Sequence, residues 1–174
     1  MSMFLDVVDP VIKGESKVNA KHADWSEKIT IGSMSYSVHG TPATGGTGLA
    51  ASGAQVSPMN VTKEMDKSTP KLFGLLAAGD KINVMFIRVS RPGGSAAGGA
   101  DGLYEAETYE LHNVIVNDYH TSGVAGPGGL PMESWTFSFT WIKETYKSPD
   151  PVTHVVSDSK TPAFGYDFGR NAPV

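Results

Sequence analysis

The chain of 174 residues contains no cysteine. This absence excludes a disulfide framework, a zinc site built on cysteine ligands and a thiol nucleophile, and it is typical of proteins that fold in a reducing compartment. No window approaches the ~20 consecutive apolar residues of a membrane-spanning helix, so the sequence predicts no membrane insertion. The opening segment MSMFLDVVDP has no basic region and no long apolar stretch. If a protein with this N-terminus leaves its cell, we expect it to do so without a cleavable signal peptide.

Clusters of positive charge are also lacking. The 14 Lys and Arg residues are outnumbered by 18 Asp and Glu, the net charge is −4, and the basic residues form no run. Aromatic residues do not interleave with them either. Nucleic-acid-binding surfaces need such clusters to neutralise phosphates, so the sequence predicts no nucleic-acid partner.

Signatures of catalysis are absent as well. The chain contains no GxSxG, HExxH, GxxxxGK[ST] or GxGxxG motif. The five histidines are spread along the chain, and the two nearest to each other, His112 and His120, are too far apart along a strand to bind one metal. We interpret Asp66, Lys67 and Ser68 as the charged entry to a helix. The sequence therefore predicts no catalytic, cofactor or metal-binding residue, and no enzyme.

Glycine, by contrast, is abundant. The chain has 20 glycines, more than the ~7% usual in soluble proteins. Most lie in three blocks, at residues 40–55, 91–102 and 122–131. The pieces between these blocks are too short to fold alone, so we expect loops within a single domain covering residues 1–174.

Strand patterns fill the segments between the blocks. In SWTFSFTWIKETY (134–146), aromatic residues alternate with Ser and Thr, which predicts one strand with an aromatic face and a hydroxylated face. In the centre of KINVMFIRVS (81–90), both odd and even positions are apolar, which predicts a strand buried on both faces. Further strands are expected at MFLDVVDPVIKG before Pro10, at 27–40 and at 109–120, with weaker ones at PVTHVVS (151–157) and AFGYDFGR (163–170). Six to nine strands with one helix indicate a mainly β fold, as a closed or nearly closed barrel or a sandwich.

The segment MDKSTPKLFGLLAAGD (65–80) predicts the helix. Thr69 is expected to be its N-cap, Pro70 its first residue and Gly79 its end. An apolar face is expected from its leucines and Phe73.

The region 40–57 is long, almost uncharged and rich in Ala, Gly and Thr. Such a composition suits contact with protein better than exposure to solvent. The hydroxylated strand face allows two interpretations, a surface that lines a lumen or accepts a neighbouring subunit, and an ordinary solvent-facing side of a sheet.

Several motifs carry a family resemblance. IKGESK (12–17) is soon followed by HADW (22–25), and DKSTPKL (66–72) then opens the helix. With ESWTFSFTWIKETY and GYDFGRN near the end, this order resembles the haemolysin-coregulated protein (Hcp) family, the tube protein of the type VI secretion system. The chain departs from the family pattern at NAK before HADW, at the glycine block 91–102 and in the tail from Ser148.

The resemblance implies a two-sheet β-barrel with one short α-helix on its side, assembling as a hexameric ring. Rings of the family stack into a hollow tube that a contractile sheath expels, with small effectors in the lumen and a VgrG-like spike as a further partner. The resemblance also implies assembly in the bacterial cytoplasm followed by secretion. The chain ends soon after GYDFGRN, so no appended toxin domain is expected, and any enzymatic role would come from cargo.

Two groups of site residues follow from the resemblance. The expected ring-stacking loop contains Gly40, Thr41, Gly45, Gly46, Gly48, Leu49 and Ala50. The expected subunit-interface or architectural motif contains Lys13, Gly14, Glu15, Ser16, Asp66, Lys67, Ser68, Thr69 and Pro70. Within it, we hypothesise that Lys13 and Glu15 pair across a subunit boundary.

Two other functions compete with this interpretation. One is the tube of a related contractile machine such as a phage tail, which would share the barrel. The other is a monomeric carbohydrate-binding β-sandwich, which requires several of Trp25, Trp135 and Trp141 to face water.

Overall fold

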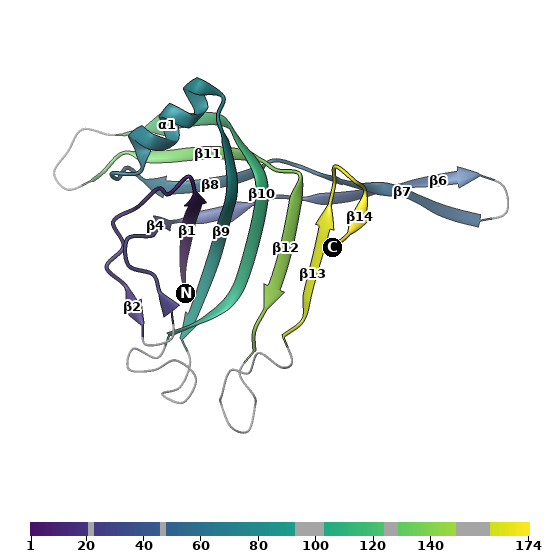
Figure 1. Ribbon diagram of the computed structural model, residues 1–174, viewed down its shortest axis with the longest axis horizontal. Coiled ribbons are helices and arrows are strands. Elements are labelled where there is room, and N and C mark those ends of the chain that lie inside the picture. The colour runs from purple at the N-terminus through teal and green to yellow at the C-terminus, as the bar shows by residue number, and fades with distance from the viewer. Residues whose placement is uncertain (21–22, 46–47, 93–102, 124–128, 149–160) are drawn as a thin grey trace.

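A computed structural model gives the conformation of residues 1–20, 23–45, 48–92, 103–123, 129–148 and 161–174. These residues form one helix and fourteen strands (Figure 1). The elements are β1 (Ser2–Asp9), β2 (Asn19–Ala20), β3 (Ala23–Asp24), β4 (Ile29–Ile31), β5 (Ser33–Ser35), β6 (Val38–Gly45), β7 (Gly48–Val56), β8 (Met59–Glu64), α1 (Thr69–Ala78), β9 (Lys81–Pro92), β10 (Leu103–Ser122), β11 (Met132–Ser138), β12 (Trp141–Tyr146), β13 (Ala163–Asp167) and β14 (Ala172–Pro173).

Ten of the strands form one antiparallel sheet, and β2–β3 and β6–β7 form two small separate sheets. The long strand β10 organises the large sheet, because it pairs with β9 along one edge and with β11 and β12 along the other. From there the sheet continues through β8 to β5, through β13 to β14, and through β9 to β1 and β4. Its strands curve around a shared interior, and α1 lies across one end (Figure 1).

The two ends of this sheet approach each other through β4 and β5. These strands are consecutive in the chain, yet β4 pairs with β1 and β5 pairs with β8. Between them, the Gly32 N–H donates to the Thr62 carbonyl at 2.7 Å. The pairings confirm a mainly β fold with one short helix, but they do not join the described strands into a closed barrel.

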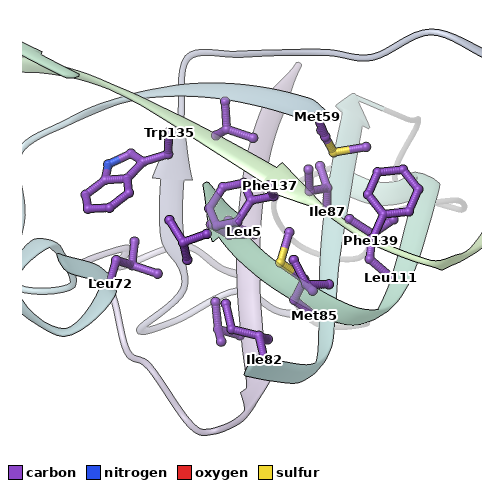
Figure 2. Close-up of a cluster of buried hydrophobic side chains, with 14 of the residues drawn as sticks. Leu5, Met59, Leu72, Ile82, Met85, Ile87, Leu111, Trp135, Phe137 and Phe139 are labelled. Atoms are coloured by element: carbon purple, nitrogen blue, oxygen red, sulfur yellow. The ribbon is translucent and has the colours of Figure 1, made fainter. Parts of the chain in front are cut away.

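The hydrophobic core fills the interior of the curved sheet. Alternate side chains of the strands point inward, as the period of two requires, and α1 adds Leu72 (Figure 2). The central side chains include Leu5, Met59, Ile82, Met85, Ile87, Leu111, Trp135 and Phe137, each at most 1% exposed. A second, smaller cluster stacks Trp25 on Phe4, with ring centroids 5.5 Å apart.

The segment 134–146 is two strands, so the expectation of one was wrong. The alternation holds in β11, where Trp135 and Phe137 are buried, and extends to Phe139. It then shifts phase, because Ile142 is buried while Trp141 is only half-buried. Both strands follow the same edge of β10, and the break lies opposite Asn113, whose φ of 51° is left-handed. An irregularity in the partner strand therefore interrupts the alternation.

The other strand expectations have mixed outcomes. β9 is not buried on both faces, because Val84 and Phe86 are only half-buried. The segment 27–40 is divided among β4, β5 and the start of β6, so the strands exceed the expected six to nine. The opening and closing strands are confirmed as β1 and β13. Residues 151–157 lie outside the described residues.

The helix is confirmed, with one correction at its start. Ser68, and not Thr69, is the N-cap, so Pro70 is the second helical residue. Gly79 ends the helix with φ of 70°, as expected. Leu72 is fully buried, whereas Phe73 is 50% exposed and contacts Tyr119, so the apolar face is narrower than expected. α1 has ten residues, and no helix in the described part of the chain is long and apolar enough to cross a membrane.

Candidate functional site

The motif KGES lies where the chain leaves β1 and passes over a neighbouring segment. Gly14 N–H donates to the Glu27 carbonyl at 2.6 Å, and Ser16 N–H donates to the Lys28 carbonyl at 3.0 Å. A Cβ on Gly14 would lie 2.4 Å from both Ile29 Cα and the Lys28 carbonyl oxygen. Only glycine allows this close approach of two backbones.

The structure brings KGES and DKSTP together. The Glu15 side chain accepts a hydrogen bond from the Lys67 N–H at 3.0 Å, across 52 residues of sequence. Lys13 forms an exposed ion pair with Glu27. Both residues of the hypothesised subunit-boundary pair thus have partners within their own chain, and the hypothesis itself stays a prediction.

Asp66 organises the entry to α1. Its Oδ1 accepts hydrogen bonds from the Ser68 N–H at 3.0 Å and from the Ser68 hydroxyl, and it lies 2.8 Å from Lys63 Nζ. Ser68 makes no capping hydrogen bond with its own side chain. The carboxylate therefore satisfies a free N–H at the helix start, a role expected of the Thr69 hydroxyl.

The Thr69 hydroxyl instead joins a buried polar network beneath the helix. It donates to Glu133 Oε2 at 2.9 Å and accepts from Lys63 Nζ at 3.0 Å. Lys63 Nζ lies 2.8 Å from the same Glu133 oxygen, and both of these side chains are fully buried. Lys63 also donates to the Glu64 carbonyl, so every hydrogen of its ammonium group has an acceptor nearby.

Glu133 has four donors around its carboxylate. Besides Lys63 and Thr69, the Trp135 indole N–H donates to Oε2 at 3.1 Å and the Tyr119 hydroxyl donates to Oε1 at 3.1 Å. Burial by itself would raise the pKa of Glu133, but the hydrogen bonds from Lys63, Trp135 and Thr69 and the charge of Lys63 outweigh it and hold the pKa below its ordinary value. The carboxylate is therefore charged in the folded protein.

Sequence reasoning missed Lys63 and Glu133. A signal was present, because Lys63 is in phase with Met59 and Val61 on β8, and Glu133 is in phase with Trp135 and Phe137 on β11. What the sequence does not show is that β8 pairs with β11 in the register that sets Glu133 directly opposite Lys63. Only that pairing makes two buried charges compatible with folding.

The region 40–56 is a hairpin and not a loop, which corrects the expectation. β6 and β7 pair antiparallel, with Gly45 opposite Gly48, Thr44 opposite Leu49 and Ala43 opposite Ala50. Gly40 and Thr41 flank a register shift at the base, and Gly46 lies outside the described residues. Two consecutive extended segments satisfy their backbone groups by pairing with each other, which an unpaired loop of this length cannot do.

The hairpin extends away from the large sheet (Figure 1). At its base, a Cβ on Gly53 would lie 2.0 Å from Asn171 Oδ1, so the C-terminal segment closely approaches β7. The Tyr166 hydroxyl donates to the same Asn171 oxygen at 2.6 Å. The glycine-rich composition therefore has a structural role at one identified position, where the chain end crosses the hairpin.

Within the described residues, no group of three or more His, Asp or Glu side chains is arranged to hold a metal ion. His112 contacts Glu110 at 2.7 Å and Trp141, and no other carboxylate among the residues with a described conformation joins them. The candidate site consists of the hairpin, the KGES and DKSTP junction and the polar network beneath α1.

The aromatic platform required by a carbohydrate-binding module is missing at two of its three expected positions. Trp25 and Trp135 are each 1% exposed, and Trp141 is half-buried against His112. The indoles at Trp25 and Trp135 therefore cannot stack on a sugar.

Comparison with known proteins gives the family. The model of the family described as "Type VI secretion system effector, Hcp" matches residues 4–146. A protein described as a type six secretion system protein has a similar structure, with a TM-score of 0.82 at 19% identity over 99% of both chains. Hcp1 from Salmonella typhimurium is also similar, with a TM-score of 0.71 at 22% identity over 99% of both chains. The secreted protein Hcp3 from Pseudomonas aeruginosa has a TM-score of 0.63 at 14% identity over 96% of both chains.

No curated protein matches the chain by sequence. The structural similarities show the shared fold, and the family match covers most of the chain, from β1 to the end of β12. The chain therefore belongs to the Hcp family of type VI secretion system proteins.

Proposed function

We propose that this protein is a tube subunit of a type VI secretion system, with a structural role and no catalysis. In this proposal the curved sheet is completed as a barrel, six copies close into a ring, and rings stack into a hollow tube. The proposal rests on one observation above all, the hairpin β6–β7 extending from a sheet of Hcp fold.

The hairpin suits a contact between rings. Its strands pair only with each other in the described residues, so they form a protrusion and not part of the large sheet. A ring that stacks on itself needs a head-to-tail contact repeated by every subunit, and a protruding arm supplies such a contact. We therefore assign Gly40, Thr41, Gly45, Gly46, Gly48, Leu49 and Ala50 to the stacking arm.

The second group of residues supports the subunit in a different way. Glu15 contacts Lys67, and Asp66, Ser68 and Thr69 fix the start of α1. These contacts favour an architectural role for Lys13–Ser16 and Asp66–Pro70 over a direct role at the subunit boundary. They hold α1 and the segment after β1 in one relative position, which a closed ring requires of each copy.

The partners and location follow from the same proposal. A contractile sheath would surround the tube, a VgrG-like spike would cap it, and small effectors would occupy its lumen. Assembly would take place in the bacterial cytoplasm, followed by export into the medium or a target cell. The family match favours this secretion role over the phage-tail alternative.

The test is the mass of the purified protein by light scattering after size exclusion, followed by negative-stain imaging. We expect rings of about six subunits that stack at high concentration. Replacing residues 41–52 by a short Asn-Gly turn should leave the rings intact and remove stacking. Lys71→Ala, an exposed change on α1, is the control and should alter neither. A monomer at high concentration would contradict the ring, and stacking without the arm would contradict its assignment.

A further inference from the structure

An open pocket of about 330 Å³ lies where β10, β12 and β13 meet, near the C-terminal end of β12. In Figure 1 this end of β12 points away from α1. The walls are Glu107, Tyr109, Glu144, Thr145, Tyr146, Pro162, Ala163 and Phe164. None of these residues belongs to the sites discussed above.

The strand registers place the pocket on the same face of the sheet as the core. Leu111 and Ile142 are opposite each other and buried. Tyr109 and Glu144, each two residues away from this pair on its own strand, are opposite each other. Phe164 on β13 is opposite Glu144 on the other side. Because side chains alternate between faces, the inward surface here changes from aliphatic side chains to aromatic rings and carboxylates.

A cation of the chain is already bound beside the pocket, on the side formed by Glu107 and Tyr146. Arg91 forms an ion pair with Glu107, and its guanidinium carbon lies 5.9 Å from the centre of the Tyr146 ring. The Tyr109 hydroxyl donates to the other Glu107 oxygen at 3.3 Å. The chain's own guanidinium is thus bound by one carboxylate and one aromatic face.

On the other side of the pocket, a second carboxylate lies beside aromatic rings. The Glu144 side chain forms no ion pair or hydrogen bond with any described residue, and Glu144 lies between Tyr109 and Phe164 in the strand register. Phe164 is 65% exposed, so its ring is accessible from solvent. The apolar walls remove water from the Glu144 carboxylate at the rim, and this desolvation raises its pKa. A carboxylate in this setting is stabilised by a positive charge brought close to it.

We propose that this pocket binds an organic cation, an ammonium or guanidinium group on a short apolar stem, with Glu144 as its counter-ion. Tyr109 and Phe164 flank the charged group, as aromatic faces do when they bind cations. Pro162 and Ala163 contact the stem. The volume is at the lower end for small-molecule sites and suits a single amine or one basic side chain.

Saturation-transfer NMR on the protein of 174 residues tests this proposal, because the method works in any assembly state. The probes are n-butylammonium and n-butylguanidinium, and n-butanol is the neutral control of nearly the same shape. We expect saturable binding of both cations and weaker binding of the alcohol. Equal binding of the alcohol, or no binding of either cation, would overturn the proposal.

Variants assign the binding to the pocket. Glu144→Gln should weaken cation binding about fivefold, as expected for an ion pair at a partly exposed rim. Glu110→Gln is the matched control, because it removes a carboxylate from the opposite face of β10, where Glu110 contacts His112. Equal losses in the two variants would show non-specific attraction to an acidic protein and would overturn the site.

A further probe distinguishes two kinds of ligand, a free amine and a basic side chain of another protein. N-acetyl-lysine-N-methylamide carries the same ammonium group on a peptide backbone. Binding at least as tight as that of n-butylammonium would support a lysine-bearing partner, and a marked loss would support a small free amine. Cation saturation should also lower the pKa of Glu144, and an unchanged pKa would count against direct contact.

Discussion

Nζ of Lys63 lies 2.8 Å from Oε2 of Glu133, and neither side chain is exposed to solvent. The two residues are register partners on β8 and β11, directly beneath the start of α1. Burying two charges costs several kcal/mol each, so the arrangement is tolerated only because each group has a full set of partners. It links two strands and the helix through one polar contact.

Removing one partner should therefore cost much more than removing both. We expect Lys63→Met to destabilise the protein by about 3–5 kcal/mol, because the buried Glu133 would lose the hydrogen bond and the opposite charge that offset its desolvation. The double variant Lys63→Met with Glu133→Leu should be clearly more stable than Lys63→Met alone. Urea unfolding of the wild type, both single variants and the double variant gives the coupling energy. Simple additivity of the two single effects would contradict this prediction.

The same pair predicts a loss of stability in acid. The folded-state pKa of Glu133 lies below its ordinary value of 4.5, so the folded state binds fewer protons than the unfolded state in this range. The contribution of Glu133 is therefore fully present above that value and is lost as the pH falls through the folded-state pKa. The measurement is the free energy of unfolding from neutral to strongly acidic pH, for the wild type and for Glu133→Gln. The difference between them should shrink in acid, and a constant difference would contradict the prediction.

Two glycines give opposite predictions for the same change. Gly14→Ala would put a Cβ 2.4 Å from the backbone of Ile29 and should destabilise by about 1–3 kcal/mol. Gly74→Ala in α1 meets no atom within 4 Å and should stabilise by about 0.5–1 kcal/mol, because alanine is the better helix former. Thermal unfolding of the two variants checks both signs. A harmless Gly14→Ala would show that the two backbones can separate without cost.

The junction between KGES and DKSTP can be tested through Glu15. Glu15→Ala removes the acceptor of the Lys67 N–H and should cost about 0.5–1.5 kcal/mol, whereas Glu15→Gln keeps an oxygen and should cost less. Lys13→Met breaks only an exposed pair with Glu27 and should change stability by less than about 1 kcal/mol.

Ring assembly of the charge reversals Lys13→Glu and Glu15→Lys tests the subunit-boundary hypothesis separately. Loss of rings with unchanged stability of the subunit would support a contact between subunits. Intact rings would leave both residues with an architectural role alone.

Features set by neighbouring residues could be predicted from the sequence. The helix 69–78 follows from Pro70 near its start and from Gly79, which adopts the left-handed conformation just past its end. The inward face of β11 follows from the period of two. The family resemblance rests on short motifs of the same kind, and the family match confirms it.

Features set by pairing between distant segments needed the tertiary structure. The break after β11 depends on an irregular backbone at Asn113 in the partner strand. The burial of Lys63 depends on its pairing with Glu133, which lies 70 residues later in the sequence. The region 40–56 is a hairpin because its two halves pair, although its composition by itself indicates a loop.

The physical reason is the range of the interactions. Capping, turn conformation and side-chain alternation act within a few residues, so the sequence by itself determined the mainly β character, the helix and the motifs. Strand register and charge burial depend on contacts between segments far apart in the chain, and each is stable only when both sides are in place. The tertiary structure alone decided that Glu15 meets Lys67, that Lys63 meets Glu133, and that Glu144 lies beside aromatic rings in a pocket.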